Sequence, residues 1–205
     1  MEDSDETADS YKISADLLIS KRGDKSKIIG YLFKAASLYS EANRKKAIDC
    51  LADLYNNLRG GTTEFEMNLY FRYMHQLARA YEDLEEKEKA ADIYLQLARE
   101  FHRIIEKSLN EESELYLKNL KKFAVYLAKA LILYDSAERY DLILKLARIY
   151  YKEFPELQKN KNLHGELFFC YEHIINAADI TGSRYFREYY AELDRKLRES
   201  EIFAE

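Results

Sequence analysis

The stretch MHQLARAYEDLEEKEKAADIYLQL, residues 74–97, decides the fold class of this chain. Its apolar residues recur at intervals of three and four, as at Met74, Leu77 and Tyr81, a spacing that gives a helix one apolar face. The charged segment 85–89 separates two such patterns. A connection this short makes the two helices run antiparallel, so the stretch predicts a helix hairpin.

The same periodicity continues in both directions, and no segment alternates in the manner of a strand. Six Gly and one Pro in 205 residues leave few places for a helix to break. Gly23 and Gly182 suit helix C-termini. The pattern predicts an all-α chain of about nine helices, a leader and four hairpins, over residues 10–22, 25–41, 44–58, 64–83, 86–108, 111–135, 137–153, 163–180 and 183–201. In the first of these we expect Ile13, Leu17 and Leu18 to face inward.

Charge is uneven along the sequence. Residues 1–10 contain five acidic residues and no basic one. Removing these five from the total of 37 leaves 32 acidic residues, equal to the 32 basic ones. We expect residues 1–9 to be a disordered acidic tail and residues 10–205 to be a single domain. A neutral body lacks the basic field that nucleic-acid binding needs.

The hairpins resemble a known repeat family. Met74-x-x-Leu77-Ala78-x-x-Tyr81, followed by Ala90-x-x-x-Tyr94 and Leu97, resembles the tetratricopeptide (TPR) repeat. Small residues there would let paired helices approach closely, and aromatic residues would wedge between them.

Other hairpins extend the resemblance. Ala35 and Ala47 repeat the twelve-residue spacing of Ala78 and Ala90, and Pro155 lies where a repeat would end. The intervals between hairpins exceed the roughly 34 residues of a standard repeat, which is closer to the SNAP-like variant with long hairpins. The resemblance implies a right-handed superhelical array of antiparallel hairpins, an α-solenoid, over residues 25–201.

Catalytic and metal-binding patterns are missing from the sequence. None of the four His follows a Glu by three residues, and no HExxH, CxxC, GxSxG or Gly-rich phosphate loop occurs. Cys170 and His173 share a helix face, which we interpret as a core thiol beside a boundary histidine. We therefore expect no enzymatic activity, no metal and no cofactor.

Two surfaces are candidates for partner binding in the groove that the resemblance implies. The first is a polar stripe at i, i+3, i+7 and i+10, consisting of Arg72, His75, Arg79 and Glu82. Its arginines could bind a partner carboxylate or phosphate, or the stripe could simply be solvated. The second is apolar, includes Leu32, Tyr39, Val125 and Ile132, and could take an amphipathic helix of a partner or of this chain's own N-terminal segment.

The last hairpin carries aromatic residues that could mediate self-association. Tyr185 with Tyr189, and Phe186 with Tyr190, form i, i+4 pairs on a helix that no further repeat covers. We expect Tyr185, Tyr189 and Tyr190 either to support a homodimer or to pack as a self-capping helix.

The sequence favours a non-enzymatic scaffold or adaptor that binds a peptide or helix of a partner protein. Two alternatives stay open, an RNA-associated helical-repeat protein and a SNAP-like adaptor in the assembly of a larger complex. No apolar run is long enough to cross a bilayer, and the acidic start resembles neither a secretory nor a mitochondrial signal. We expect a cytoplasmic location without membrane insertion.

Overall fold

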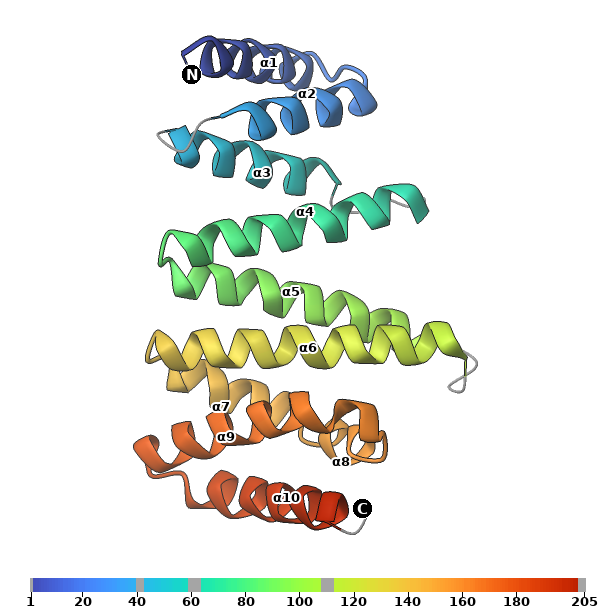
Figure 1. The fold of residues 1–205 in the computed structure, drawn as a ribbon, viewed down its shortest axis with the longest axis vertical. Helices are drawn as coiled ribbons and strands as arrows, with labels where there is room; N and C mark the ends of the chain where they lie inside the picture. The colour runs from blue at the N-terminus through green and yellow to red at the C-terminus, as the bar shows by residue number, and fades with distance from the viewer. Residues whose placement is uncertain (1, 40–42, 59–63, 108–112, 203–205) are drawn as a thin grey trace. The chain divides into compact units, whose positions relative to one another are not determined.

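Every regular element is helical in the residues that the computed structural model describes, 2–39, 43–58, 64–107 and 113–202. The all-α prediction is confirmed for these residues. The chain divides into two compact units, residues 1–85 and 86–205 (Figure 1). This differs from the single domain expected over residues 10–205, because the boundary falls in the charged connection of the hairpin that opened the sequence analysis.

The first unit consists of four helices that pack in chain order. Each of α1, α2 and α3 lies against the helix that follows it (Figure 1). The helices are α1 (Glu2–Ser20), α2 (Lys25–Leu38), α3 (Arg44–Leu58) and α4 (Glu64–Asp83). Asp24 caps α2 by accepting hydrogen bonds from the backbone N–H groups of Ser26 and Lys27. The first N–H groups of a helix have no partner within the helix, so the side chain of Asp24, which accepts from two of them, sets the start of α2.

The acidic leader is helical from Glu2, where sequence analysis expected disorder over residues 1–9. Polar contacts to α2 and α3 order it. The Tyr39 hydroxyl donates to Asp9 Oδ1 at 2.7 Å, and Lys46 Nζ lies 3.0 Å from the same oxygen. Asn43 Nδ2 donates to Asp5 Oδ2 at 2.9 Å. Asp5 and Asp9 therefore have specific partners, which composition alone could not reveal.

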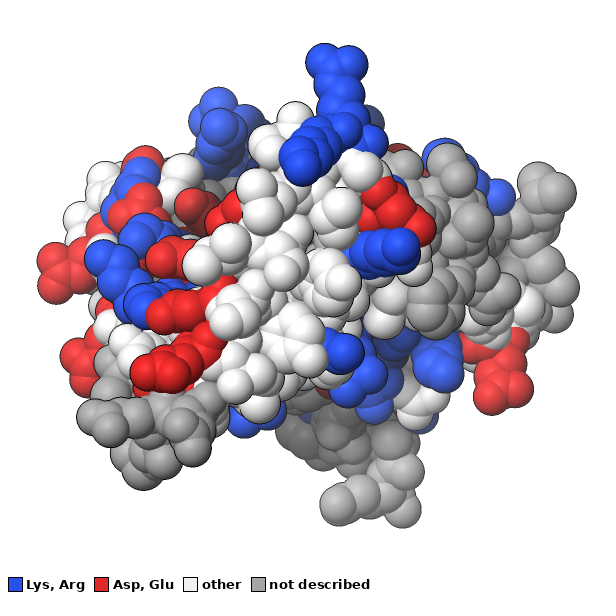
Figure 2. Space-filling model, turned by 90° about the horizontal axis from the view of Figure 1, so that it is seen from above, with Lys and Arg blue, Asp and Glu red and all other residues white. Residues whose placement is uncertain are grey.

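The packed face of α1 also differs from expectation. Ala8 and Ala15 are fully buried, and the ring of Tyr11 lies 5.9 Å from that of Tyr31 on α2. Ile13 and Leu17, expected to face inward, are 59% and 53% exposed. The small residues allow α1 to approach α2 closely, and this choice of face turns the aliphatic residues outward. Figure 2, seen from the side of α1, shows uncharged surface between charged groups.

The second unit contains two long helices followed by shorter elements. Long α5 and α6 pack against each other, and α6 also contacts α7 and α9. The elements are α5 (Lys87–Glu106), α6 (Glu114–Ser136), α7 (Tyr140–Ile149), α8 (Glu153–Leu157), the 3₁₀ turn η2 (Lys161–Leu163), α9 (His164–Thr181) and α10 (Arg184–Ile202).

The helix expected over residues 137–153 is divided into α7 and α8, which raises the number of α-helices in the described residues from nine to ten. Pro155 does not end a helix as expected, but lies in the first turn of α8, where its missing N–H costs little. Because α7 has only 10 residues, α9 reaches past it and packs directly on α6.

Aromatic side chains form the core of the second unit. The rings of Tyr94 and Phe101 lie 5.9 and 5.8 Å from that of Tyr126 in stacked arrangements. Tyr134 is 1% exposed and donates its hydroxyl to Asp92, across the α5–α6 pair. Burial of the rings supplies apolar contact while the hydroxyl groups keep polar partners, so these tyrosines are structural.

Three helices end with the same hydrogen-bond arrangement. At the end of α9, Gly182 has φ +70° and the Ser183 N–H donates to the Ala178 carbonyl at 2.8 Å. Arg22 and Glu138 occupy the equivalent left-handed position after α1 and α6. The prediction for Gly182 is confirmed. The left-handed residue after α1 is Arg22 instead of Gly23, whose added Cβ would lie 2.8 Å from a methyl carbon of Leu18.

These helix ends predict opposite effects for two substitutions. Gly182→Ala should lower the free energy of unfolding by about 1 kcal/mol, because alanine is strained at positive φ and no nearby atom adds to that cost. Glu138→Gly should raise it by up to about 1 kcal/mol by relieving the same strain. Urea unfolding followed by circular dichroism measures both, and an equal sign for the two changes would contradict the explanation.

The contacts of Asp9 predict a pH dependence for the first unit. Hydrogen bonds from Tyr39 and then Lys46 lower the pKa of Asp9 below its usual value. The stabilisation is therefore complete above the unfolded-state pKa of about 4 and is lost as the pH falls through the lowered folded-state pKa. Asp9→Asn should reduce the urea midpoint at pH 7 and have less effect at acidic pH. Asp49→Asn, at an exposed position on α3, is the matched control.

Candidate functional site

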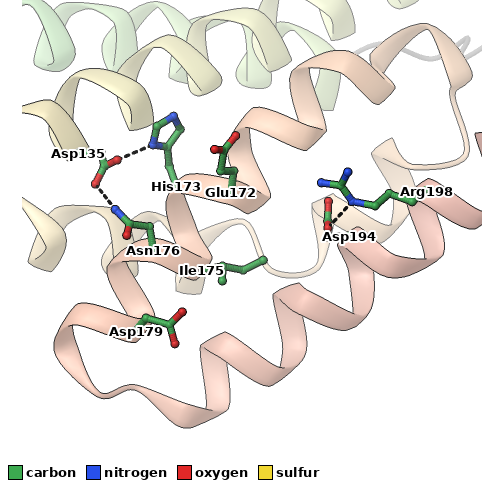
Figure 3. Close-up of a pocket in the computed structure, with 8 residues that line it drawn as sticks. All are labelled: Asp135, Glu172, His173, Ile175, Asn176, Asp179, Asp194 and Arg198. Carbon is green, nitrogen blue, oxygen red and sulfur yellow. Dashed lines mark hydrogen bonds and ion pairs between the residues drawn. The ribbon is translucent and has the colours of Figure 1, made fainter.

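A cleft of about 500 Å³ lies between α6, α9 and α10 in the second unit (Figure 3). It lies where α9 packs directly on α6, at the C-terminal end of α6. The eight lining residues are mostly polar and are Asp135, Glu172, His173, Ile175, Asn176, Asp179, Asp194 and Arg198. Sequence analysis did not single out these residues or bring them together.

Asp135, in the last turn of α6, is held in place by two side chains of α9. His173 Nδ1 lies 2.7 Å from one carboxylate oxygen, and Asn176 Nδ2 donates to the other at 2.9 Å (Figure 3). The side chains of Asp135 and His173 are 18% and 19% exposed. These bonds fix the α6 edge of the cleft. They also give a polar partner to His173, which is half-buried one turn after the buried free thiol Cys170.

The opposite edge is formed by Asp194 and Arg198 of α10. Arg198 Nε donates to Asp194 Oδ2 at 2.8 Å, and the guanidinium lies 5.0 Å from the ring of Phe168. This hydrogen bond, aided by the charge of Glu172, raises the pKa of Arg198 above its usual value. Asp194 Oδ1 is buried and accepts no hydrogen bond from the described residues. Arg198 therefore compensates only part of the negative charge at this edge.

The lining as a whole is acidic. Asp135, Glu172, Asp179 and Asp194 face one guanidinium and one histidine. Asp179 forms an ion pair with Arg187 outside the lining. Glu172 and Asp179 are exposed at the mouth. A cleft of this composition can accept a cationic side chain, which would exchange water for charge-assisted hydrogen bonds to fixed carboxylates.

A smaller hollow of about 290 Å³ lies beside the start of α10, lined by Arg148, Tyr151, Ser183, Tyr185 and Phe186. The guanidinium of Arg148 lies 5.9 Å from the ring of Phe186. Tyr185 is 67% exposed and stacks on Tyr189, whose hydroxyl donates to the Tyr151 carbonyl at 3.1 Å.

The self-association residues are therefore not one surface. Tyr190 is fully buried, donates its hydroxyl to the Ala147 carbonyl at 2.6 Å, and packs against the rings of Phe154 and Tyr171. Its expected surface role is wrong, because α10 turns this side chain toward α7 and α9. Tyr189 is half-buried, and Tyr185 alone of the three is exposed.

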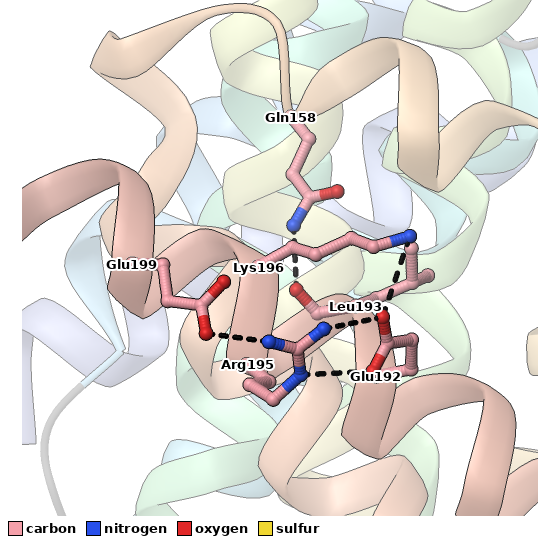
Figure 4. A network of polar contacts seen from close by, with 6 residues as sticks. All are labelled: Gln158, Glu192, Leu193, Arg195, Lys196 and Glu199. Carbon is pink, nitrogen blue, oxygen red and sulfur yellow. Dashed lines mark hydrogen bonds and ion pairs between the residues drawn. The ribbon is translucent and has the colours of Figure 1, made fainter.

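The exposed face of α10 is dominated by ion pairs. Arg195 donates to both carboxylate oxygens of Glu192, at 2.7 and 2.9 Å, and also pairs with Glu199 (Figure 4). The hydrogen bonds from Arg195 lower the pKa of Glu192 to about 2. Gln158 Nε2 donates to the Leu193 carbonyl at 2.7 Å and so ties the loop after α8 to α10. This face resembles a polar cap more than a docking surface.

The groove candidates on the first unit differ in accessibility. Arg72 and Arg79 are exposed on α4, while His75 and Glu82 are half-buried on the same helix. Leu32 is fully buried on α2, so it cannot contact a partner. The hydroxyl of Tyr39 already donates a hydrogen bond to Asp9 of α1. The alternative in which the chain's own N-terminal helix covers the apolar stripe of α2 fits these contacts.

Val125 and Ile132, the groove candidates of the second unit, are half-buried on α6. They lie ten and three residues before Asp135, so the three share one helix face. Of these three residues, Asp135 lines the acidic cleft. The α4 stripe and the α6 stripe fall in different compact units.

Metal binding and membrane insertion can be assessed for the described residues. No three His, Cys, Asp or Glu side chains among them are placed to hold a metal ion. None of the helices in these ranges is both long and apolar enough to span a membrane.

Comparison with models of known protein families finds no match, and comparison with curated proteins finds none either. The resemblance to TPR repeats therefore stays a prediction from the residues quoted above.

The buried position of Tyr190 predicts an effect on stability without an effect on association. Tyr190→Phe removes the hydrogen bond to the Ala147 carbonyl and should lower the free energy of unfolding by about 1 kcal/mol. Urea unfolding tests this, and sedimentation of the native protein should be unchanged. Tyr185→Phe, at an exposed position, is the control and should alter neither measurement. A change in sedimentation caused by Tyr190→Phe alone would contradict the assignment.

Proposed function

We propose that the chain is a non-enzymatic scaffold or adaptor of the TPR/SNAP-like kind, a right-handed array of helix hairpins that binds a segment of a partner protein. The observation that carries this proposal is the open cleft between α6, α9 and α10. Pockets for small molecules are mostly apolar, whereas this one is lined largely by carboxylates. Its composition suits a charged side chain carried by a larger partner.

The chemistry of the surface specifies the kind of segment. Val125 and Ile132 supply half-buried apolar contacts on α6, and Asp135 follows on the same face. Glu172 and Asp179 add exposed carboxylates from α9. An amphipathic peptide or helix with apolar residues followed by Lys or Arg would complement both parts. Arginine suits the cleft best, because its planar donors can bind a carboxylate in bidentate geometry.

We propose a cytoplasmic location for this activity. Cys50 and Cys170 are both free and buried, one in each unit. Burial raises the pKa of the Cys50 thiol to about 11 and raises that of Cys170 further. Thiols that are buried and protonated in this way fit a reducing compartment, since they form no disulfide and react slowly.

The proposal predicts that reversing one charge at the mouth of the cleft weakens binding. Peptides selected from a random library on the wild-type protein should be enriched in Arg or Lys beside apolar residues. Glu172→Lys should weaken these peptides about tenfold or more, because a cation would then face a cation. Fluorescence anisotropy with labelled peptides measures the affinity at fixed salt concentration.

Two comparisons make this experiment decisive. Glu156→Lys changes the same charge at an exposed position of α8 outside the cleft and should leave affinity nearly unchanged. Arg72→Ser with Arg79→Ser tests the alternative stripe on α4. If selected peptides are acidic, or lose affinity with the α4 changes and not with Glu172→Lys, the cleft is not the binding site.

A further inference from the structure

The outer face of α1 carries apolar side chains with no helix packed over them in the described residues. Ile13 and Leu17 are 59% and 53% exposed, although Ala8 and Ala15 on the inner face are fully buried. Ser10 and Glu6, which lie one and two turns before Ile13, are also exposed. The spacing of 6, 10, 13 and 17 is that of a single helix face, and Figure 2 shows uncharged surface on this side of the protein.

The inner face of α1 is already fixed, so the outer face is available without rearrangement. Lys12 Nζ lies 2.6 Å from Asp16 and 3.0 Å from Asp53 of α3. Together with the contacts of Asp9 to Tyr39 and Lys46, this anchors α1 along most of its length. A second molecule would therefore meet a rigid, ordered helix.

Charge changes sign along this face. Glu6 lies near the start of α1, and Lys21 and Arg22 follow its end. All three are exposed, and none of them forms an ion pair with a described residue. In an antiparallel pair centred between Ile13 and Ser14, position 6 of one copy lies opposite position 21 of the other. Opposite charges then meet at both ends of the helix pair, whereas a parallel pair would place like charges opposite one another.

Helix α10, which also has an exposed face, lacks these properties. On α10, Arg195 is shared between Glu192 and Glu199, and Arg184 pairs with Glu188. Its charges are satisfied within one molecule, so they offer little to a second copy. The outer face of α1 combines an apolar centre with unsatisfied and self-complementary ends.

From these observations we infer that the outer face of α1 is a two-fold interface with a second copy of this chain. Ile13 of the two copies lies at its centre, Leu17 of each copy lies opposite Ser10 of the other, and Glu6 of each copy pairs with Lys21 of the other. Contact through one helix face buries less than the roughly 1,200 Å² of a standard interface, so the dimer is weak and depends on concentration. Its exposed ion pairs make it weaker at high salt.

Sedimentation velocity over about two decades of protein concentration tests the interface. The wild-type protein should shift from monomer to dimer, and less so at high salt. Ile13→Ser with Leu17→Ser should abolish the shift while circular dichroism shows an unchanged helix content. Tyr185→Ser is the matched control on α10 and should leave the shift intact. A monomer at every concentration, or a dimer that survives the α1 changes, would overturn the inference.

Charge exchange tests the antiparallel register. Glu6→Lys or Lys21→Glu alone should weaken the dimer, because each places like charges opposite one another twice. The double variant should recover association, since the pairs are restored with reversed sign. Failure of recovery would rule out this register, provided that circular dichroism shows α1 still helical despite its less favourable terminal charges.

Disulfide trapping gives a readout that needs no change in charge. Ser14→Cys lies close to the proposed two-fold axis and should form a covalent dimer under mild oxidation, because the native Cys50 and Cys170 are buried. Ser20→Cys should not, since in the antiparallel pair the two residues are about 13 positions apart along the axis, roughly 20 Å. Trapping at Ser20, with or without trapping at Ser14, would indicate a parallel pair and contradict the inference.

Discussion

Close approach of neighbouring helix backbones depends on alanines buried in their packed faces, and the larger side chains are arranged around them. An alanine at a helix crossing permits an interaxial distance that leucine or tyrosine would prevent. The alanines that are at most 1% exposed include Ala8, Ala15, Ala35 and Ala78 in the first unit, and Ala90, Ala98, Ala124, Ala130, Ala147, Ala177 and Ala178 in the second. On α1, where alanines form the packed face, the larger aliphatic residues Ile13 and Leu17 are exposed on the opposite face.

Tyrosine fills the spaces between the helices that alanine brings together. Each ring adds apolar contact, while its hydroxyl needs a polar partner that only one arrangement supplies. The hydroxyl of Tyr134 donates a hydrogen bond to Asp92, that of Tyr190 to the Ala147 carbonyl, and that of Tyr39 to Asp9. These directional bonds fix the register of one helix against another, which apolar contact alone would leave loosely specified. Aromatic residues that the sequence offered as interface candidates are for this reason largely internal.

The periodicity of apolar residues predicted the helices well but not which face each one buries. On α1 the larger residues Ile13 and Leu17 suggested the wrong face, because the alanine positions carry no hydrophobic signal of their own. The division of residues 137–153 into α7 and α8 was equally hidden, since the apolar pattern continues through the break. The cleft could not be predicted, because Asp135, Glu172 and Asp194 are far apart in the sequence and come together only through the packing of α9 on α6 and on α10.

Within each unit, the helices pack mainly on the elements next to them in the chain, and the α6–α9 pair is separated by only two short helices and a turn. Most native contacts are therefore local, and the entropy of closing long loops is a small part of the folding barrier. Such a topology allows folding to nucleate in any one hairpin and spread to its neighbours. A growing chain leaving the ribosome could consolidate each hairpin as it emerges, without waiting for distant segments to be made.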